Sequence, residues 1–127
     1  MSKRIVSTKH APAAVGPYSQ GVIMDGWLWT SGQVALDPAS GKLVGSDAAT
    51  QAERALENLA RILAEGGSGL DRVVRTTVYL TSMDDFKPVN EVYARFFSEP
   101  YPARACVEVR RLPVGALVEI DAIARVG

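Results

Sequence analysis

The sequence predicts an α+β fold with two helices packed on one face of a mixed sheet of about six strands. Residues 46–66 and 84–97 place apolar side chains at the 3.6-residue period of a helix. The other patterned segments are short, rich in β-branched and aromatic residues, and bounded by turn residues. A chain of 127 residues, 47% apolar and 22% charged, is predicted to form a single domain over residues 1–127.

The N-terminal part is predicted to contain three short strands. Residues 4–7 form the first, and residues 19–24 and 27–31 form a hairpin. The hairpin turn is Asp25-Gly26, because both residue types tolerate the positive φ angles that a two-residue turn requires.

The first helix is predicted to begin near Ser46 or Asp47, either of which can cap its N-terminus. Gly66 and Gly67 end it. Its buried positions follow the i, i+3, i+4, i+7 pattern and are Ala52, Ala55, Leu56, Leu59, Ile62 and Leu63.

The C-terminal half is predicted to alternate strands with a second helix. Residues 73–80 are β-branched and aromatic, which is typical of a strand. Asp84 and Asp85 introduce the helix, whose first turn tolerates Pro88. Residues 104–110 and 117–123 follow as strands. The helix buries an apolar stripe that indicates core packing rather than a cofactor site, namely Val89, Val92, Tyr93, Phe96 and Phe97.

The face of the sheet opposite the helices is predicted to carry apolar residues as well. In the last strand Val118, Ile120, Ala122 and Ala124 share one face, and Ile123 interrupts the polar residues of the other. Apolar residues left on a face without helices predict self-association.

Composition excludes several classes of function. Fourteen basic and fourteen acidic residues cancel, and there is no basic run, so no nucleic-acid partner is expected. We expect no signal peptide and no membrane span, since no stretch approaches the roughly 18 apolar residues required. The single cysteine cannot form an internal disulfide and indicates a reducing, cytoplasmic location.

Metal and phosphate-loop chemistry is not predicted either. His10 and Cys106 are the only histidine and cysteine, too few for a zinc site of the usual kind, and His10 is interpreted as a solvated side chain. The glycines of residues 66–69 fit no phosphate-loop spacing.

The segment of residues 102–109 is the most informative for function. Strand alternation places Arg104 and Cys106 on one face and Ala105 and Val107 on the other. A guanidinium at the mouth of a strand can grip a carboxylate or phosphate through two parallel hydrogen bonds. The alternative interpretation is a surface arginine beside a buried structural thiol.

Four segments, in order along the chain, carry a resemblance to a known family. They are Gly16-Pro17-Tyr18-Ser19-Gln20, residues 31–38 (SGQVALDP), residues 102–109 (PARACVEV) and residues 118–124 (VEIDAIA). Together they resemble the Rid family of reactive intermediate deaminases, formerly the YjgF family, and its RidA type in particular. The resemblance implies a chorismate-mutase-like fold of the bacillus type and a homotrimer with sites at subunit interfaces.

The resemblance also implies an activity, the hydrolysis of 2-imino and 2-enamino acids to 2-oxo acids and ammonia. Arg104 would bind the substrate carboxylate, Glu119 would orient or deprotonate the attacking water, and Tyr18 would hydrogen-bond the substrate or that water. The pocket would be completed by Ser31, Gly32, Cys106 and Asn90. An imine is already electrophilic, so no metal or organic cofactor is expected. Cys106 is interpreted as a pocket wall, since an ordinary thiol pKa of about 8.5 leaves it mostly protonated.

Two of these residues are predicted not to meet within one chain. If the strands bearing Arg104 and Glu119 form a simple hairpin, about five residue steps separate them, roughly 16 Å. A pocket that uses both would therefore lie between subunits.

Three alternatives stay open from the sequence. Tyr18 is either a pocket residue or a turn aromatic that covers the core, and Glu119 is either a catalytic or a solvated residue. The whole protein is either an enzyme, a regulatory trimer that binds a small carboxylate, or an RNA-directed endoribonuclease or translation inhibitor. The lack of net charge argues against the last.

Overall fold

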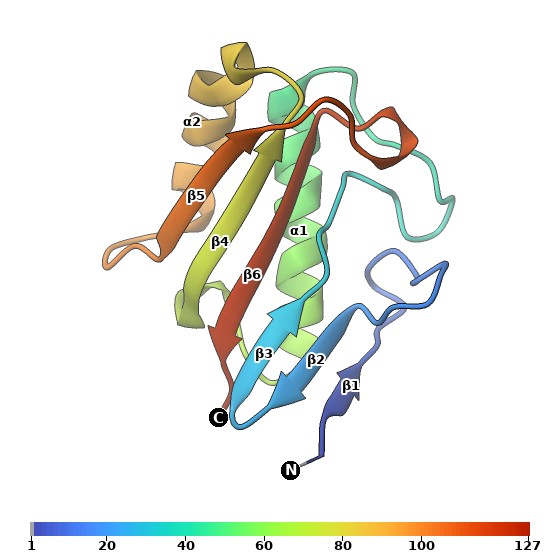
Figure 1. Ribbon diagram of the computed structural model, residues 1–127, viewed down its shortest axis with the longest axis vertical. Coiled ribbons are helices and arrows are strands. Elements are labelled where there is room, and N and C mark those ends of the chain that lie inside the picture. Colours follow the sequence, from blue (N-terminus) through green and yellow to red (C-terminus); the bar gives the residue numbers. More distant parts are fainter. Residues whose placement is uncertain (1) are drawn as a thin grey trace.

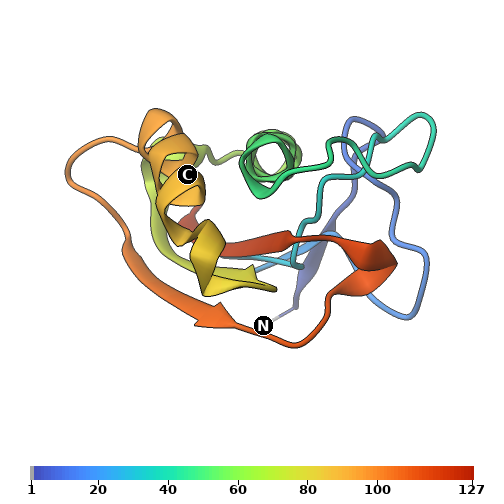
Figure 2. The same cartoon turned by 90° about the horizontal axis from the view of Figure 1, so that it is seen from above.

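Residues 2–127 of the computed structural model fold into one mixed sheet with both helices on the same face (Figures 1 and 2), which confirms the predicted architecture. The sheet order is β1-β2-β3-β6-β4-β5. Only the β4–β5 pair is parallel. The strands are β1 (Arg4–Val6), β2 (Gly21–Met24), β3 (Trp27–Thr30), β4 (Val73–Leu80), β5 (Ala103–Glu108) and β6 (Val118–Arg125).

The predicted hairpin is confirmed. β2 and β3 pair in antiparallel fashion around Asp25-Gly26, whose φ angles are 54° and 81°. β2 begins two residues later than predicted, at Gly21, because Ser19 and Gln20 belong to the preceding loop.

Helix α1 (Ala48–Glu65) supplies most of the core on the helix side of the sheet. Asp47 caps it by accepting a hydrogen bond from the backbone N–H of Thr50. It ends at Gly66, and Gly67 follows with a φ of 81°. All six predicted core positions of this helix are fully buried.

Helix α2 (Phe86–Phe96) follows a short 3-10 turn at Met83–Asp85. The rings of Tyr93 and Phe97 stack with centroids 4.4 Å apart. Both are buried, and Phe96 is partly buried, so this aromatic stripe is core packing as predicted. Within residues 2–127, neither helix combines the length and the apolarity that crossing a bilayer would require.

The predicted hairpin between the last two strands is wrong. Strand β4 lies between β5 and β6, so these two strands do not pair (Figure 1). Helix α2 carries the chain from β4 back to the start of β5, a β-α-β connection that makes these strands parallel. The chain then crosses the end of β4 through the turn at Pro113–Gly115 and returns antiparallel as β6.

The sheet face without helices carries an apolar row across four strands. Strand register aligns Ile5 with Val22, Val22 with Trp29, and Trp29 with Ile123. Ile5 and Trp29 are each about half exposed, at 51% and 52%. This row is the uncovered apolar surface that the sequence predicted.

The end of α1 packs so tightly that Gly66 has no room for a side chain. A Cβ there would overlap Cδ1 of the fully buried Leu28 and lie 3.3 Å from Cγ2 of Val6. We expect Gly66→Ala to lower the free energy of unfolding by about 1–3 kcal/mol in urea denaturation. This overpacking outweighs the roughly 0.4–1 kcal/mol that alanine contributes by restricting the unfolded chain.

Gly16→Ala is the matched control, because its nearest contact would be the Tyr18 ring at an ordinary 3.5 Å. A Gly66→Ala protein as stable as the wild type would contradict this account of the packing.

Candidate active site

Arg104 lies on the edge strand β5 with its side chain turned toward α2. Its Nη1 donates a 2.7 Å hydrogen bond to Oδ1 of Asn90 on that helix. Register places Arg104 beside Thr76 and Cys106 beside Val78, both of which face the helices. Arg104 and Cys106 therefore share a face, as strand alternation predicted. We call Arg104, Asn90 and Cys106 the arginine group.

Two aromatic rings of α2 hold the guanidinium in place. Its Cζ lies 4.8 Å from the ring centroid of Tyr93 and 5.6 Å from that of Phe86. The Tyr93 hydroxyl is fixed in turn by a buried 2.8 Å hydrogen bond with Thr76. Cation–π contacts and one amide bond orient the arginine and leave further N–H donors for a ligand. The sequence predicted Tyr93 as a core residue, gave no role to Phe86, and did not reveal either contact with Arg104.

Cys106 lines the small pocket that Arg104 and Asn90 also line. Its thiol is half-buried, and burial raises its pKa, an effect only partly opposed by the nearby charge of Arg104. The thiol is therefore mainly protonated at neutral pH, as predicted.

Glu119 and Gly32 come together on the face without helices, and we call these two residues and the neighbouring Ser31 the glutamate group. Gln33 and Ile120 exchange two backbone hydrogen bonds, of 2.8 and 3.0 Å, which tie the segment after β3 to β6. A Cβ on Gly32 would lie 2.5 Å from Oε2 of Glu119, so a larger residue there would require the Glu119 side chain to move. Ser31 Oγ donates to the carbonyl of Ser19 and holds the neighbouring loop.

The environment of Glu119 favours its protonated form. Burial raises the pKa of this carboxyl, and the charge of Asp121 two residues away on the same face raises it further. Asp121 also accepts a 3.2 Å hydrogen bond from the hydroxyl of Tyr79, which lies opposite Glu119 on β4. A half-buried carboxyl whose pKa is raised is a candidate for proton exchange with a substrate or a water molecule.

Tyr18 lies on the loop that leads into β2. It is 51% exposed, so it is not a turn aromatic covering the core. Its hydroxyl accepts a 3.4 Å hydrogen bond from the N–H of Val15, and it lines a hollow of about 420 Å³ together with Gly32. Tyr18 is thus placed on the same side as the glutamate group.

The buried side chain of Gln20 fixes this loop, a role that the sequence analysis missed. Its amide accepts from the N–H of Thr8 and donates to the carbonyls of Thr8, Ala11 and Pro12, at 2.6 to 3.3 Å. The residue was visible at the end of the Gly16–Gln20 motif, but no local pattern shows which carbonyls a buried amide will meet.

The arginine and glutamate groups do not meet within one chain. The strands that carry the two residues flank β4. Arg104 on β5 aligns with Thr76 of β4, and Glu119 on β6 aligns with Tyr79 of β4. Three residue steps and two strand spacings separate their Cα atoms by about 14 Å, and their side chains project from opposite faces. The separation that the sequence predicted therefore holds, for a different geometric reason.

Within residues 2–127, no three His, Cys, Asp or Glu side chains gather in a way that could hold a metal ion. His10 is exposed, as predicted.

Comparison with known proteins identifies the family. The family described as Endoribonuclease L-PSP matches residues 8–126. The human 2-iminobutanoate/2-iminopropanoate deaminase is 45% identical over 96% of this chain and 89% of its own. The RutC family protein y4sK of Sinorhizobium fredii is 51% identical over 93% and 94%. The chain therefore belongs to the Endoribonuclease L-PSP family, which is the YjgF/Rid family that the sequence motifs indicated.

Solved structures agree with this assignment. The crystal structure of E. coli TdcF with bound serine has a TM-score of 0.91 and 40% identity, covering 98% of this chain and 99% of its own. The fold is that of the YjgF/Rid proteins, consistent with the predicted chorismate-mutase-like class.

The contacts of Glu119 yield a prediction about its titration. We expect Asp121→Asn to lower the pKa of Glu119, because it removes a neighbouring negative charge. The pKa should stay above the ordinary value, since burial is the larger cause. Carbon-13 NMR of the side-chain carboxyl follows the titration. Asp71→Asn, in the short turn before β4, is the matched control. An unchanged pKa in Asp121→Asn would contradict the proposed coupling.

Proposed function

We propose that this protein hydrolyses 2-imino and 2-enamino acids, such as 2-iminobutanoate and 2-iminopropanoate, to 2-oxo acids and ammonia. Membership of the YjgF/Rid family supports the proposal, as does 45% identity to a human protein named for this activity. The observation that best supports it is the orientation of the Arg104 guanidinium by Asn90 and Tyr93. A substrate that carries a carboxylate next to its reacting carbon would need such a group to bind that carboxylate.

Arg104 binds the substrate carboxylate through two parallel N–H···O hydrogen bonds. Asn90 and the rings of Tyr93 and Phe86 already fix the guanidinium, so little freedom is lost on binding. Holding the carboxylate fixes the adjacent imine carbon, and main-chain groups near Cys106 and Gly32 complete the cleft.

Glu119 supplies the acid–base chemistry. Its carboxylate takes a proton from water as the water oxygen bonds to the imine carbon, and the C=N electron pair moves to nitrogen. Glu119 then returns that proton to nitrogen, which gives a carbinolamine. The hydroxyl proton of the carbinolamine passes through Glu119 to the amino nitrogen, the C–N electron pair leaves with nitrogen as ammonia, and the remaining oxygen electron pair forms the C=O bond of the 2-oxo acid. The raised pKa of Glu119 suits both steps, and Tyr18 hydrogen-bonds the substrate or the water.

The site is assembled between subunits of a homotrimer. One chain holds the arginine group at its sheet edge and the glutamate group on its helix-free face, so neither face has both. The apolar row of Ile5, Val22, Trp29 and Ile123 provides a surface for association beside the glutamate group. A neighbouring chain would then bring its arginine group to this surface.

Two other functions remain alternatives, a regulatory trimer that binds a small carboxylate and an RNA-directed nuclease or translation inhibitor. A carboxylate sensor needs Arg104 but little from a water-orienting Glu119, so Glu119 separates sensor from enzyme. The net charge of zero does not favour binding to a phosphate backbone.

The carboxylate clamp is tested by Arg104→Lys. Lysine keeps the charge but loses the planar fork, so we expect kcat/KM to fall at least about tenfold, roughly 1.4 kcal/mol of transition-state stabilisation. The assay is ammonia release from freshly generated 2-aminoacrylate, with and without the protein. Arg95→Lys, an exposed position on α2, is the control. Undiminished activity in a correctly assembled Arg104→Lys protein would contradict the proposed binding of the substrate carboxylate by Arg104. No activity in the wild type would refute the proposed function itself.

The interfacial site is tested by mixing two inactive variants. We expect light scattering to give a mass near three times the 13.6 kDa chain for the wild type, Arg104→Ala and Glu119→Ala. Each variant alone should be inactive. After subunit exchange, some interfaces regain both native residues, so part of the activity should return.

Mass spectrometry verifies that exchange has taken place. Exchange without any recovery would place both residues in the pocket of one chain, against the geometry of β4, β5 and β6. An active Glu119→Ala protein would instead remove Glu119 from the mechanism.

A further inference from the structure

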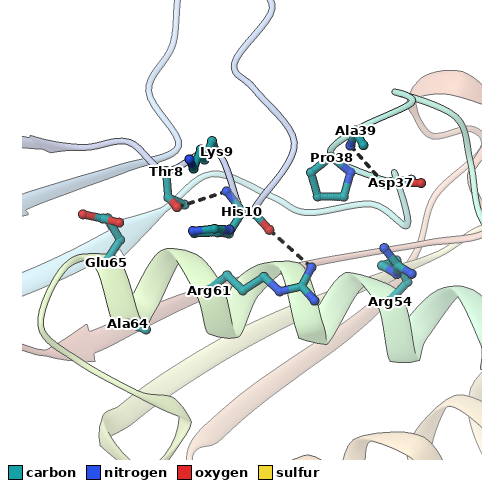
Figure 3. A pocket seen from close by; sticks show the side chains of 10 residues that line it. All are labelled: Thr8, Lys9, His10, Asp37, Pro38, Ala39, Arg54, Arg61, Ala64 and Glu65. Carbon is teal, nitrogen blue, oxygen red and sulfur yellow. Dashed lines mark hydrogen bonds between the residues drawn. The ribbon is translucent and has the colours of Figure 1, made fainter.

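A second hollow lies on the helix side of the sheet, away from both groups of candidate active-site residues. Figure 3 shows it between α1 and two loop segments, Thr8–His10 and Asp37–Ala39. Its volume is about 650 Å³, within the range of small-molecule sites. Neither Arg104 nor Glu119 lines it.

Basic side chains from two of these segments surround the hollow. Arg54 and Arg61 project from α1, and Lys9 and His10 come from the loop opposite (Figure 3). Seven residues are about two helical turns, so the two arginines lie on one side of α1, roughly 10 Å apart along its axis. Lys9, Arg54 and Arg61 carry positive charge, and Asp37 and Glu65 in the same lining carry negative charge.

Three carboxylates lie at or beside the hollow and offset part of its positive charge. Asp37 turns Oδ1 to the backbone N–H of Ala39, at 3.0 Å. Glu65 lies at the last residue of α1, one turn beyond Arg61. Glu57 lies 3.4 Å from Nε of Arg54. The donors left for an anion are Lys9, the N–H groups of Arg54 other than Nε, and those of Arg61 other than Nη1.

Hydrogen bonds hold the walls in place before any ligand binds. Arg61 Nη1 donates to the carbonyl of His10 at 3.2 Å, which joins α1 to the opposite loop (Figure 3). Thr8 Oγ1 accepts from the N–H of His10, and Gln20 holds both backbone groups of Thr8. A site organised in this way loses little entropy on binding.

We propose that this hollow binds a phosphorylated small molecule. A phosphate group carries close to two charges and three acceptor oxygens, enough to engage several of these donors, whereas one carboxylate would leave most of them unused. His10 is the only aromatic ring among the lining residues, so the site offers no platform for stacking the bases of a nucleic acid.

The phosphate site shares a wall with the candidate active site. Asp37, Pro38 and Ala39 line this hollow on one side and the Tyr18 hollow on the other. A bound phosphate would therefore stiffen the wall behind Tyr18. Association through the helix-free face would leave the phosphate site open, since it lies on the other side of the sheet.

Isothermal titration with inorganic pyrophosphate and inorganic phosphate tests the proposal on the full chain. We expect saturable binding of one ion per chain. Arg54→Gln and Arg61→Gln should each raise Kd at least about tenfold, since hydrogen bonds to charged groups are the strong ones. Lys9→Gln, on the opposite wall, should also weaken binding and does not disturb α1.

Controls separate this site from others. Arg95→Gln, on α2, removes a charge outside the hollow and should bind like the wild type. Arg104→Ala should also retain binding, whether or not the proposed deaminase activity is correct. The proposal is overturned if the wild type shows no saturable binding, if the three hollow variants bind normally, or if Arg104→Ala abolishes binding and so places the ion in the active site.

Discussion

Strand β4 pairs in parallel with β5 and antiparallel with β6, and the positions of both groups of candidate site residues depend on this central strand. Its alternate residues Thr76 and Val78 align Arg104 and Cys106 on the helix side. Tyr79, one step further, aligns Glu119 on the other side. Because a one-residue change of register would reverse every side chain, the two pairings together assign the cation and the carboxyl to opposite faces.

Buried amides then position the loops that extend from this sheet. Gln20 holds residues 8–12, and Asn58 of α1 donates from Nδ2 to the carbonyls of Val34 and Leu36, at 3.1 and 2.9 Å. Gln51 bonds the carbonyl of Gly45 and the N–H of Leu117. A buried amide is costly unless bonded, so each tether favours one loop conformation strongly. Gln20 and Asn58 thereby hold the chain before Tyr18 and after Gly32.

Local patterns in the sequence predicted the elements but not their order. The Asp25-Gly26 turn, the Asp47 cap and the glycine end of α1 were all predictable, since each depends on residues close in the chain. Alternation also placed Arg104 and Cys106 on one face. The pairing of β4 with β5 was not predicted, because nothing local distinguishes a strand's partner. The motif resemblance predicted which residues share a site, and the backbone register shows that Arg104 and Glu119 do not meet within one chain.

The hollow beside α1 was not predicted, because its basic residues are far apart in the sequence and meet only in the fold. Lys9 and His10 lie more than forty residues before Arg54 and Arg61, and the balance of fourteen basic and fourteen acidic residues gives no sign of their meeting. The fold brings them to one hollow on the helix side, while the apolar row and Glu119 occupy the opposite face. Self-association through the apolar row would complete the proposed imine-hydrolysing site and leave the basic hollow accessible. The subunit interface would then bind a carboxylate and the outer surface of the helix layer a phosphate, and the Asp37–Ala39 segment lines both this hollow and the Tyr18 hollow.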